Sequence, residues 1–236
     1  MKILPVFFFI TACVFRVFPG NLYLELRDET GLLPAGTAGQ LTEKALQTAS
    51  FITPHRVETG PAAAGEDGAF DFLYLLLRVT EGNTGAREDM SVLRFTLECE
   101  IFTGFAPGEG QDSPNFPAAA FTFYSGGAGL DSAEAEAVFI EDFQRQLLFE
   151  LMFQPLLRRD ICVLHITNKD VVLSLPREFT LKPGTEFAMT MLAPDGSTEK
   201  AGKLVVTKVE KTHALGRMLY SENPVRIGAR GEKLSL

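Results

Sequence analysis

The 236-residue sequence contains no tryptophan and only three cysteines and three histidines. No two cysteines have the Cys-x-x-Cys spacing, and His55, His165 and His213 are isolated from one another, so no pattern typical of a metal site is present. A P-loop and the Gly-x-Ser-x-Gly nucleophile motif are also missing. The sequence therefore predicts no metal, no cofactor and no enzymatic activity.

Positive charge is scarce. Lysine and arginine together number 22 against 30 acidic residues, which gives a net charge of −8. Residues 1–20 hold Lys2 and Arg16 and no acid, so removing them leaves −10. Because no lysine or arginine run offsets this charge, we expect binding neither to nucleic acid nor to anionic lipid.

The first 20 residues have the features of a secretory signal peptide. Lys2 is followed by an apolar run over residues 3–10, which is shorter than the roughly 20 residues of a membrane-spanning helix. Residues 10–13, Ile-Thr-Ala-Cys, resemble a bacterial lipoprotein signal ending at Cys13. Two alternatives stay open: lipidation of Cys13, which would be the chain's only attachment to a membrane, or cleavage near Gly20.

Residues 21–168 predict an α/β sandwich, a mixed sheet packed by two helices. Strands are expected at 22–27, 70–80, 93–101, 118–124 and 161–165, with a short extended piece at 51–53 and a turn at 81–85. One helix is expected from Thr37, with Ala38, Leu41, Ala45 and Ala49 inward. A longer helix follows the capping-box pattern Asp131-Ser132-Ala133-Glu134. Its expected inward stripe is Ala133, Ala137, Ile140, Gln144, Leu147, Leu148 and Leu151, with Phe143 at the edge.

Residues 169–236 predict a second, smaller unit. Short strands alternate with turns at 182–184 and 193–196, and no long helix is expected. The fold class is therefore α+β, with a C-terminal all-β module of the SH3-like barrel type.

Two cysteines remain outside the leader. Cys99 and Cys162 lie in apolar, strand-like stretches, where cysteine is commonly a small buried hydrophobe. We expect two buried thiols, and a disulfide between them stays an alternative.

The segment 125–129, Ser-Gly-Gly-Ala-Gly, lies between an expected strand and an expected helix. We interpret Gly126, Gly127 and Gly129 as a structural turn, in which Gly127 or Gly129 has a positive φ or leaves no room for a Cβ. A phosphate cradle is the alternative, which the neighbouring acidic residues disfavour. Ser125 lacks a histidine partner and is not expected to be a nucleophile.

Glu98 and Glu100 are expected on one face of the same strand. They could form a catalytic carboxylate pair, but charges on the wet face of an amphipathic strand are the more common explanation.

The segment 123–135 resembles the start of the last helix in three families of bacterial envelope proteins: the curli-secretion lipoprotein, flagellar-assembly protein T and TolB amino-terminal-like families. Their C-terminal parts are similar to the stretch from Ile161 onward, including 181–187, 202–206 and 227–232. The resemblance implies a periplasmic or outer-membrane-associated location and a scaffold role. Long amphipathic insertions of the curli pore and the separate N-terminal domain of the flagellar protein are not present.

The sequence thus favours a non-enzymatic scaffold of the bacterial envelope, which binds envelope proteins or copies of itself by edge-strand pairing and apolar burial. The alternative is a periplasmic solute- or glycan-binding protein, with aromatic candidates Phe102, Phe105, Phe116 and Tyr124. An exported hydrolase is disfavoured because no catalytic constellation is found.

Overall fold

The computed structural model describes residues 21–60, 73–87, 89–103, 117–154, 157, 160–168, 170–175 and 180–234. The expected signal peptide and Cys13 lie outside the described residues. The first part of the chain forms one mixed sheet and two helices: β1 (Asn21–Asp28), α1 (Thr37–Ile52), β2 (Arg56–Thr59), β3 (Leu73–Arg87), β4 (Met90–Thr103), β5 (Ala119–Gly129) and α2 (Ser132–Met152).

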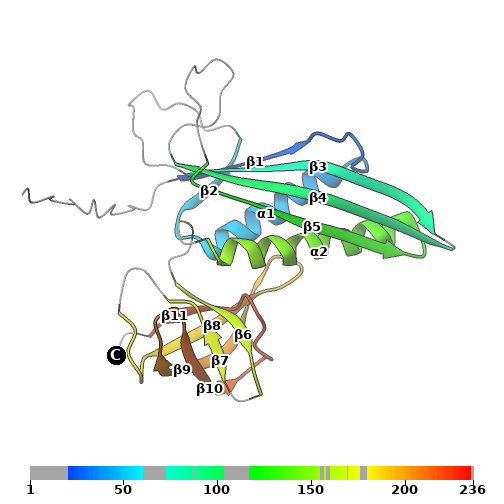
Figure 1. Ribbon diagram of the computed structural model, residues 1–236. Helices are drawn as coiled ribbons and strands as arrows, with labels where there is room; N and C mark the ends of the chain where they lie inside the picture. The colour runs from blue at the N-terminus through cyan, green and yellow to red at the C-terminus, as the bar shows by residue number, and fades with distance from the viewer. Residues whose placement is uncertain are drawn as a thin grey trace, which may run out of the picture.

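The sheet has the order β2-β1-β3-β4-β5. β1 is parallel to β2 and β3, while the β3–β4 and β4–β5 pairs are antiparallel. Both helices lie on one face of the sheet (Figure 1), and their buried side chains form a single core with residues such as Leu24, Leu75 and Leu97. The expected α/β sandwich is therefore present as a mixed sheet with two helices.

The first helix differs from expectation at both ends. Its N-cap is Gly36 in the left-handed conformation, so Thr37 is the first helical residue and caps nothing with its side chain. Phe51 and Ile52, expected in an extended piece, form the last turn, because both bury their side chains in the core. Ala38 is exposed rather than inward.

The turn expected at residues 81–85 is wrong. β3 continues to Arg87 and stays paired with β4 throughout, with a bulge between Val79 and Glu81. Gly82 lies opposite Phe95, and a Cβ on Gly82 would be 2.5 Å from the Phe95 ring. The glycine therefore makes room for an aromatic side chain within a strand.

The turn expected at residues 125–129 is also wrong, because these residues are the last part of β5. None of Gly126, Gly127 and Gly129 has a positive φ. A Cβ on Gly127 would instead lie 2.0 Å from the carbonyl oxygen of Ala135, and one on Gly129 would lie 2.6 Å from the nitrogen of Ala135. The glycines let α2 pack directly against the strand backbone.

The start of α2 agrees with its capping-box prediction. The Asp131 side chain accepts a hydrogen bond from the Glu134 N–H at 2.8 Å, and the Glu134 carboxylate accepts one from the Leu130 N–H at 2.7 Å. The expected inward stripe is partly wrong, because Ala133 and Ala137 are exposed. The buried residues of the helix are Ala135, Phe139, Ile140, Phe143, Gln144, Leu147, Leu151 and Met152.

The C-terminal part is a closed six-stranded barrel of order β10-β7-β6-β11-β8-β9, which confirms a small barrel module. Its strands are β6 (Ile161–Ile166), β7 (Val171–Leu173), β8 (Glu186–Leu192), β9 (Thr198–Val209), β10 (Ala214–Ser221) and β11 (Arg230–Lys233). The strand expected at 161–165 in the α/β unit is therefore corrected: β6 pairs with β7 and β11, so the barrel begins before residue 168.

The barrel lies against the helices, so the molecule has three layers: sheet, helices and barrel (Figure 1). β6 contributes to two cores, because Ile161 and Val163 face the barrel interior while Cys162 joins the core of the sheet and helices. Arg230 donates to the carbonyl oxygen of Phe51 at 2.9 Å. These contacts join the barrel to the rest of the fold.

Cys99 and Cys162 are both buried thiols, as expected. Within the described ranges, no helix is both long and apolar enough to span a membrane.

Candidate binding surfaces

The sheet face opposite the helices carries a network of ion pairs. Arg78 on β3 lies between Glu98 and Glu100 of β4, with N–O distances of 3.2 and 3.1 Å, and Glu29 lies 3.9 Å away. The two glutamates share this open face, as their alternation predicts. Because both carboxylates pair with Arg78, they form an ordinary ion-pair network rather than a catalytic carboxylate pair.

A second cluster lies on β1 and β3 of the same face. Glu25 pairs with Arg27 at 2.5 Å and accepts a hydrogen bond from the Tyr74 hydroxyl. The hydrogen bond from Arg27 lowers the pKa of Glu25, burial opposes this, and the Tyr74 hydroxyl adds to the lowering. Burial, and then the bond to Glu25, raise the pKa of Tyr74. Tyr74 packs on Phe102, with ring centroids 6.2 Å apart.

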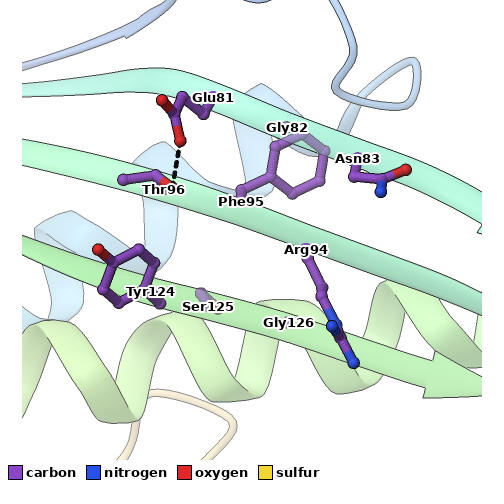
Figure 2. A pocket seen from close by; sticks show the side chains of 9 residues that line it. All are labelled: Glu81, Gly82, Asn83, Arg94, Phe95, Thr96, Tyr124, Ser125 and Gly126. Atoms are coloured by element: carbon purple, nitrogen blue, oxygen red, sulfur yellow. Dashed lines mark hydrogen bonds between the residues drawn. The ribbon is translucent and has the colours of Figure 1, made fainter.

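A hollow of about 430 Å³ lies further along the open face (Figure 2). Tyr124 projects from β5 with 72% of its surface exposed, and Arg94 projects from the neighbouring strand β4. Glu81 and Asn83 of β3 complete the rim, and Glu81 accepts a hydrogen bond from the Thr96 hydroxyl at 3.4 Å. An exposed aromatic ring beside polar groups can hold a small solute.

The aromatic residues considered for solute binding do not meet in this hollow. Phe102 is paired with Tyr74, whereas Tyr124 is paired with Thr96, six residues earlier on β4. At about 3.3 Å per residue the two sites are roughly 20 Å apart. Phe105 and Phe116 lie outside the described residues.

No residue described by the structure resembles an activated nucleophile. Ser125 is 4% exposed, and its hydroxyl donates to the carbonyl oxygen of Phe139 at 3.3 Å. Burial raises the pKa of the Cys99 thiol well above its usual range. His55 precedes β2, whereas His165 is on β6 and His213 directly precedes β10, and no cluster of metal-ligating side chains occurs in the described part of the chain.

The larger hollow is a cleft of about 820 Å³ between α2 and the barrel. One wall is the outer side of α2. The opposite wall comes from the end of β8 with the turn that follows it, and from residues 226–229 before β11. Gly126 of β5 lines both this cleft and the hollow at Tyr124, so the two meet at the outer edge of the sheet.

Asp142 of α2 lies at the end of the cleft that is next to the sheet. Its carboxylate accepts a hydrogen bond from the Gly126 N–H at 3.0 Å and pairs with Arg145. Gln144 also lines the cleft, is 5% exposed, and has an Nε2 without a hydrogen-bond partner among the described residues. The cleft thus combines apolar walls with a few polar groups.

The cleft is bordered by large apolar side chains that remain exposed. Val138 and Phe149 of α2 and Ile227 of the barrel all line it, and Phe153 stacks edge-on against Phe149 with ring centroids 5.0 Å apart. Each of the four is between 41 and 45% exposed. We call these four residues the cleft patch. Exposed apolar side chains gathered in this way are typical of surfaces that bind proteins, membranes or apolar ligands.

Sequence reasoning did not find this cleft. Phe149 and Val138 belong to the helix predicted from residue 131, but their partner Ile227 is about 80 residues away in the chain. The only available signal was that Phe149 falls off the apolar stripe of its helix. A single apolar residue on the polar side of a helix is common, so this signal by itself does not predict the cleft.

No family model and no curated protein matches the chain. Among solved structures, the hypothetical protein CT253 from Chlamydia trachomatis is 9% identical, with a TM-score of 0.38 over 56% of this chain and 95% of that one. The PelC dodecamer from Paraburkholderia phytofirmans is 15% identical, with a TM-score of 0.36 over 54% and 85%. Lipoprotein GNA1162 from Neisseria meningitidis is 12% identical, with a TM-score of 0.33 over 48% and 85%.

TM-scores this low do not establish a shared fold, so these likenesses carry no argument about function. None of the three families that the sequence resembles is identified by the comparisons, and a link to flagellar assembly has no support in them.

Proposed function

We propose that this chain is a non-enzymatic assembly module of the bacterial envelope that binds another protein through the cleft between α2 and the barrel. The observation that carries the proposal is the cleft patch, in which Val138, Phe149, Phe153 and Ile227 stay exposed beside a cleft of about 820 Å³. Each side chain is between 41 and 45% exposed, so covering the rest of its surface contributes about 0.6–1.4 kcal/mol.

The envelope location is supported by the composition of residues 1–20, with Lys2 followed by an apolar run. Export is tested by mass analysis of the N-terminus of native protein. We expect a chain that begins at Cys13 with attached lipid, or after about residue 20. An intact Met1 on the native protein would contradict export.

The binding proposal is tested by chemical cross-linking in intact envelopes, followed by recovery of the chain and its partners. Phe149→Asp places a charge in the cleft patch and is expected to abolish recovery of a specific partner. Leu219→Asp is the matched control, because Leu219 is also an exposed apolar residue but lies on β10, away from the cleft. Equal recovery by both variants, or no partner for the wild type, would refute the proposal.

Binding of a small solute is the second candidate, and the hollow at Tyr124 is the observation that favours it (Figure 2). Tyr124 offers a ring for stacking, and Arg94, Asn83 and Glu81 offer hydrogen bonds. A glycan or polar-solute panel measured by calorimetry tests it. Binding that Tyr124→Ala removes and Phe149→Asp leaves unchanged would support this function instead.

A further inference from the structure

β5 is the last strand of the sheet, so one side of its backbone has no strand partner among the described residues. Gly126 directs its N–H to this outer side, because it donates to Asp142 rather than to β4. In an antiparallel ladder, alternate residues direct their backbone groups to the same side. Ala120, Thr122 and Tyr124 therefore present their N–H and C=O groups outward.

This edge lacks the features that usually prevent another strand from pairing with an edge strand. From Ala119 to Tyr124 the strand has no charged residue and no proline. The opposite edge of the sheet, β2, has four residues and carries an ion pair between Arg56 and Glu58. Short, charged edges resist the addition of another strand, whereas long uncharged edges accept one.

The cleft reaches this same edge, since Gly126 lines it together with Asp142 and Val138 of α2. Side chains of a strand alternate between the two faces of the sheet. In a strand added beside β5, one set of side chains would lie beside Ala120, Thr122 and Tyr124 on the open face. The other set would enter the space between α2 and the barrel.

A second copy of this chain does not fit the edge. α2 follows β5 closely, from Ala135 beneath Gly127 and Gly129 to Phe143, whose ring lies 6.0 Å from that of Phe123. Antiparallel pairing of β5 with its symmetry mate sets the two strands about 4.8 Å apart. The two α2 helices would then be separated by about the same distance, but packed helices need about 8–10 Å.

We infer that the outer edge of β5 receives an extended segment of a partner protein by strand addition, with alternate apolar side chains of that segment in the cleft. The inference rests on the proposed function and adds that the bound segment is an extended strand. Backbone pairing with β5 would provide the affinity, and the cleft would provide the specificity.

The direct test uses a short synthetic peptide in which threonine alternates with leucine, with a lysine at each end. Residue-resolved amide exchange is measured on the wild-type chain with and without the peptide. Exchange is expected to slow at Ala120, Thr122 and Tyr124, and to stay unchanged at Phe121 and Phe123, which already face β4. Replacing each leucine of the peptide by aspartate is expected to weaken binding by at least about ten-fold, because the cleft walls are mostly apolar.

Two variants of one residue supply the second measurement. Thr122→Pro removes an outward N–H at a place where an edge strand tolerates proline, and is expected to reduce peptide affinity by at least about ten-fold. Thr122→Val keeps the N–H and the strand propensity, and is expected to bind like the wild type. Circular dichroism checks the fold of both, and the exchange pattern of the wild type remains decisive if the proline variant does not fold.

The outcomes separate this inference from the proposed function. Peptide binding that leaves the exchange of all three outward amides unchanged, or equal affinity of Thr122→Pro and wild type, would overturn strand addition. If these amides become protected when the concentration of the chain alone is raised, the occupant is a second copy of the chain. That result would overturn the inference that a different protein binds the edge. If cross-linking recovers a partner that Phe149→Asp loses but Thr122→Pro keeps, strand addition fails while the proposed function stands.

Discussion

The carboxylate of Asp142 accepts a hydrogen bond from the backbone N–H of Gly126 at 3.0 Å, across the outer edge of β5. The bond joins the middle of α2 to the last strand of the sheet. The bond also marks the end of the open part of the edge. After Tyr124, the next outward N–H of β5 is that of Gly126, and it already donates to Asp142. One carboxylate thus limits how far an added strand can extend.

Asp142→Ala is expected to lower the free energy of unfolding by about 1–3 kcal/mol, because a hydrogen bond to a charged acceptor is lost. Amide exchange at Gly126 should become faster. Urea unfolding and residue-resolved exchange measure both effects. Glu141→Ala is the control, since Glu141 is an exposed carboxylate on the same helix, and it should change neither quantity. Slow exchange at Gly126 in Asp142→Ala would show that the bond does not protect this amide.

Gly127→Ala is expected to destabilise the fold by about 1–3 kcal/mol through overpacking. The new Cβ would lie 2.0 Å from the carbonyl oxygen of Ala135, which is backbone and can move only with α2. Gly85→Ala is the matched control, because Gly85 also lies in a strand and has nothing within 4 Å of its Cβ position. Equal urea midpoints for the two variants would contradict the close strand–helix contact.

Ser125→Ala should cost about 0.5–1.5 kcal/mol, the value of one neutral hydrogen bond, here from the Ser125 hydroxyl to the carbonyl oxygen of Phe139. Partner binding should be unchanged, because the hydroxyl is buried and directed at α2. Urea unfolding and the cross-linking assay measure the two effects. A variant that folds like the wild type but loses a hydrolytic or binding activity would assign Ser125 a functional role.

The lowered pKa of Glu25 predicts a contribution to the pH dependence of stability. A carboxyl whose folded-state pKa is below its unfolded value of about 4.3 stabilises the fold above that pH. The stabilisation is lost as the pH falls through the folded-state pKa, because the proton removes the charge that Arg27 and Tyr74 bind. Glu25→Gln should therefore unfold with a flatter pH dependence in the acid range.

Urea unfolding at a series of acid pH values measures this slope. Tyr74→Phe is the matched variant, because it removes the hydroxyl that donates to Glu25 and keeps Arg27. It should flatten the slope less than Glu25→Gln does. A slope that Glu25→Gln leaves unaltered would show that Glu25 does not contribute to acid unfolding.

Local patterns in the sequence determined several elements of the fold. The capping residues Asp131 and Glu134 define the start of α2, because both bonds connect residues within four positions. Strict alternation over residues 93–101 determined the two faces of β4, since its helix-side residues are buried and Glu98 and Glu100 are on the open face. The burial of Cys99 follows from the same alternation.

Tertiary structure decided the features that depend on residues far apart in the chain. Gly126, Gly127 and Gly129 suggest a turn in the sequence, but they lie in β5, and α2 packs so closely on this strand that positions 127 and 129 need glycine. The pattern of residues 161–166 predicts a strand but not the sheet that it joins, and its pairing with β7 and β11 assigns it to the barrel.

The candidate cleft was decided in the same way. Phe149 and Ile227 line one cleft only because the closed barrel lies against α2, and the free edge of β5 exists only because no other described strand pairs there. A sequence pattern determines which face of an element is apolar, because that depends on the local period of the chain. Which two faces meet, and which edge stays open, depends on packing between distant elements, and the proposed binding surface lies at such a meeting of faces.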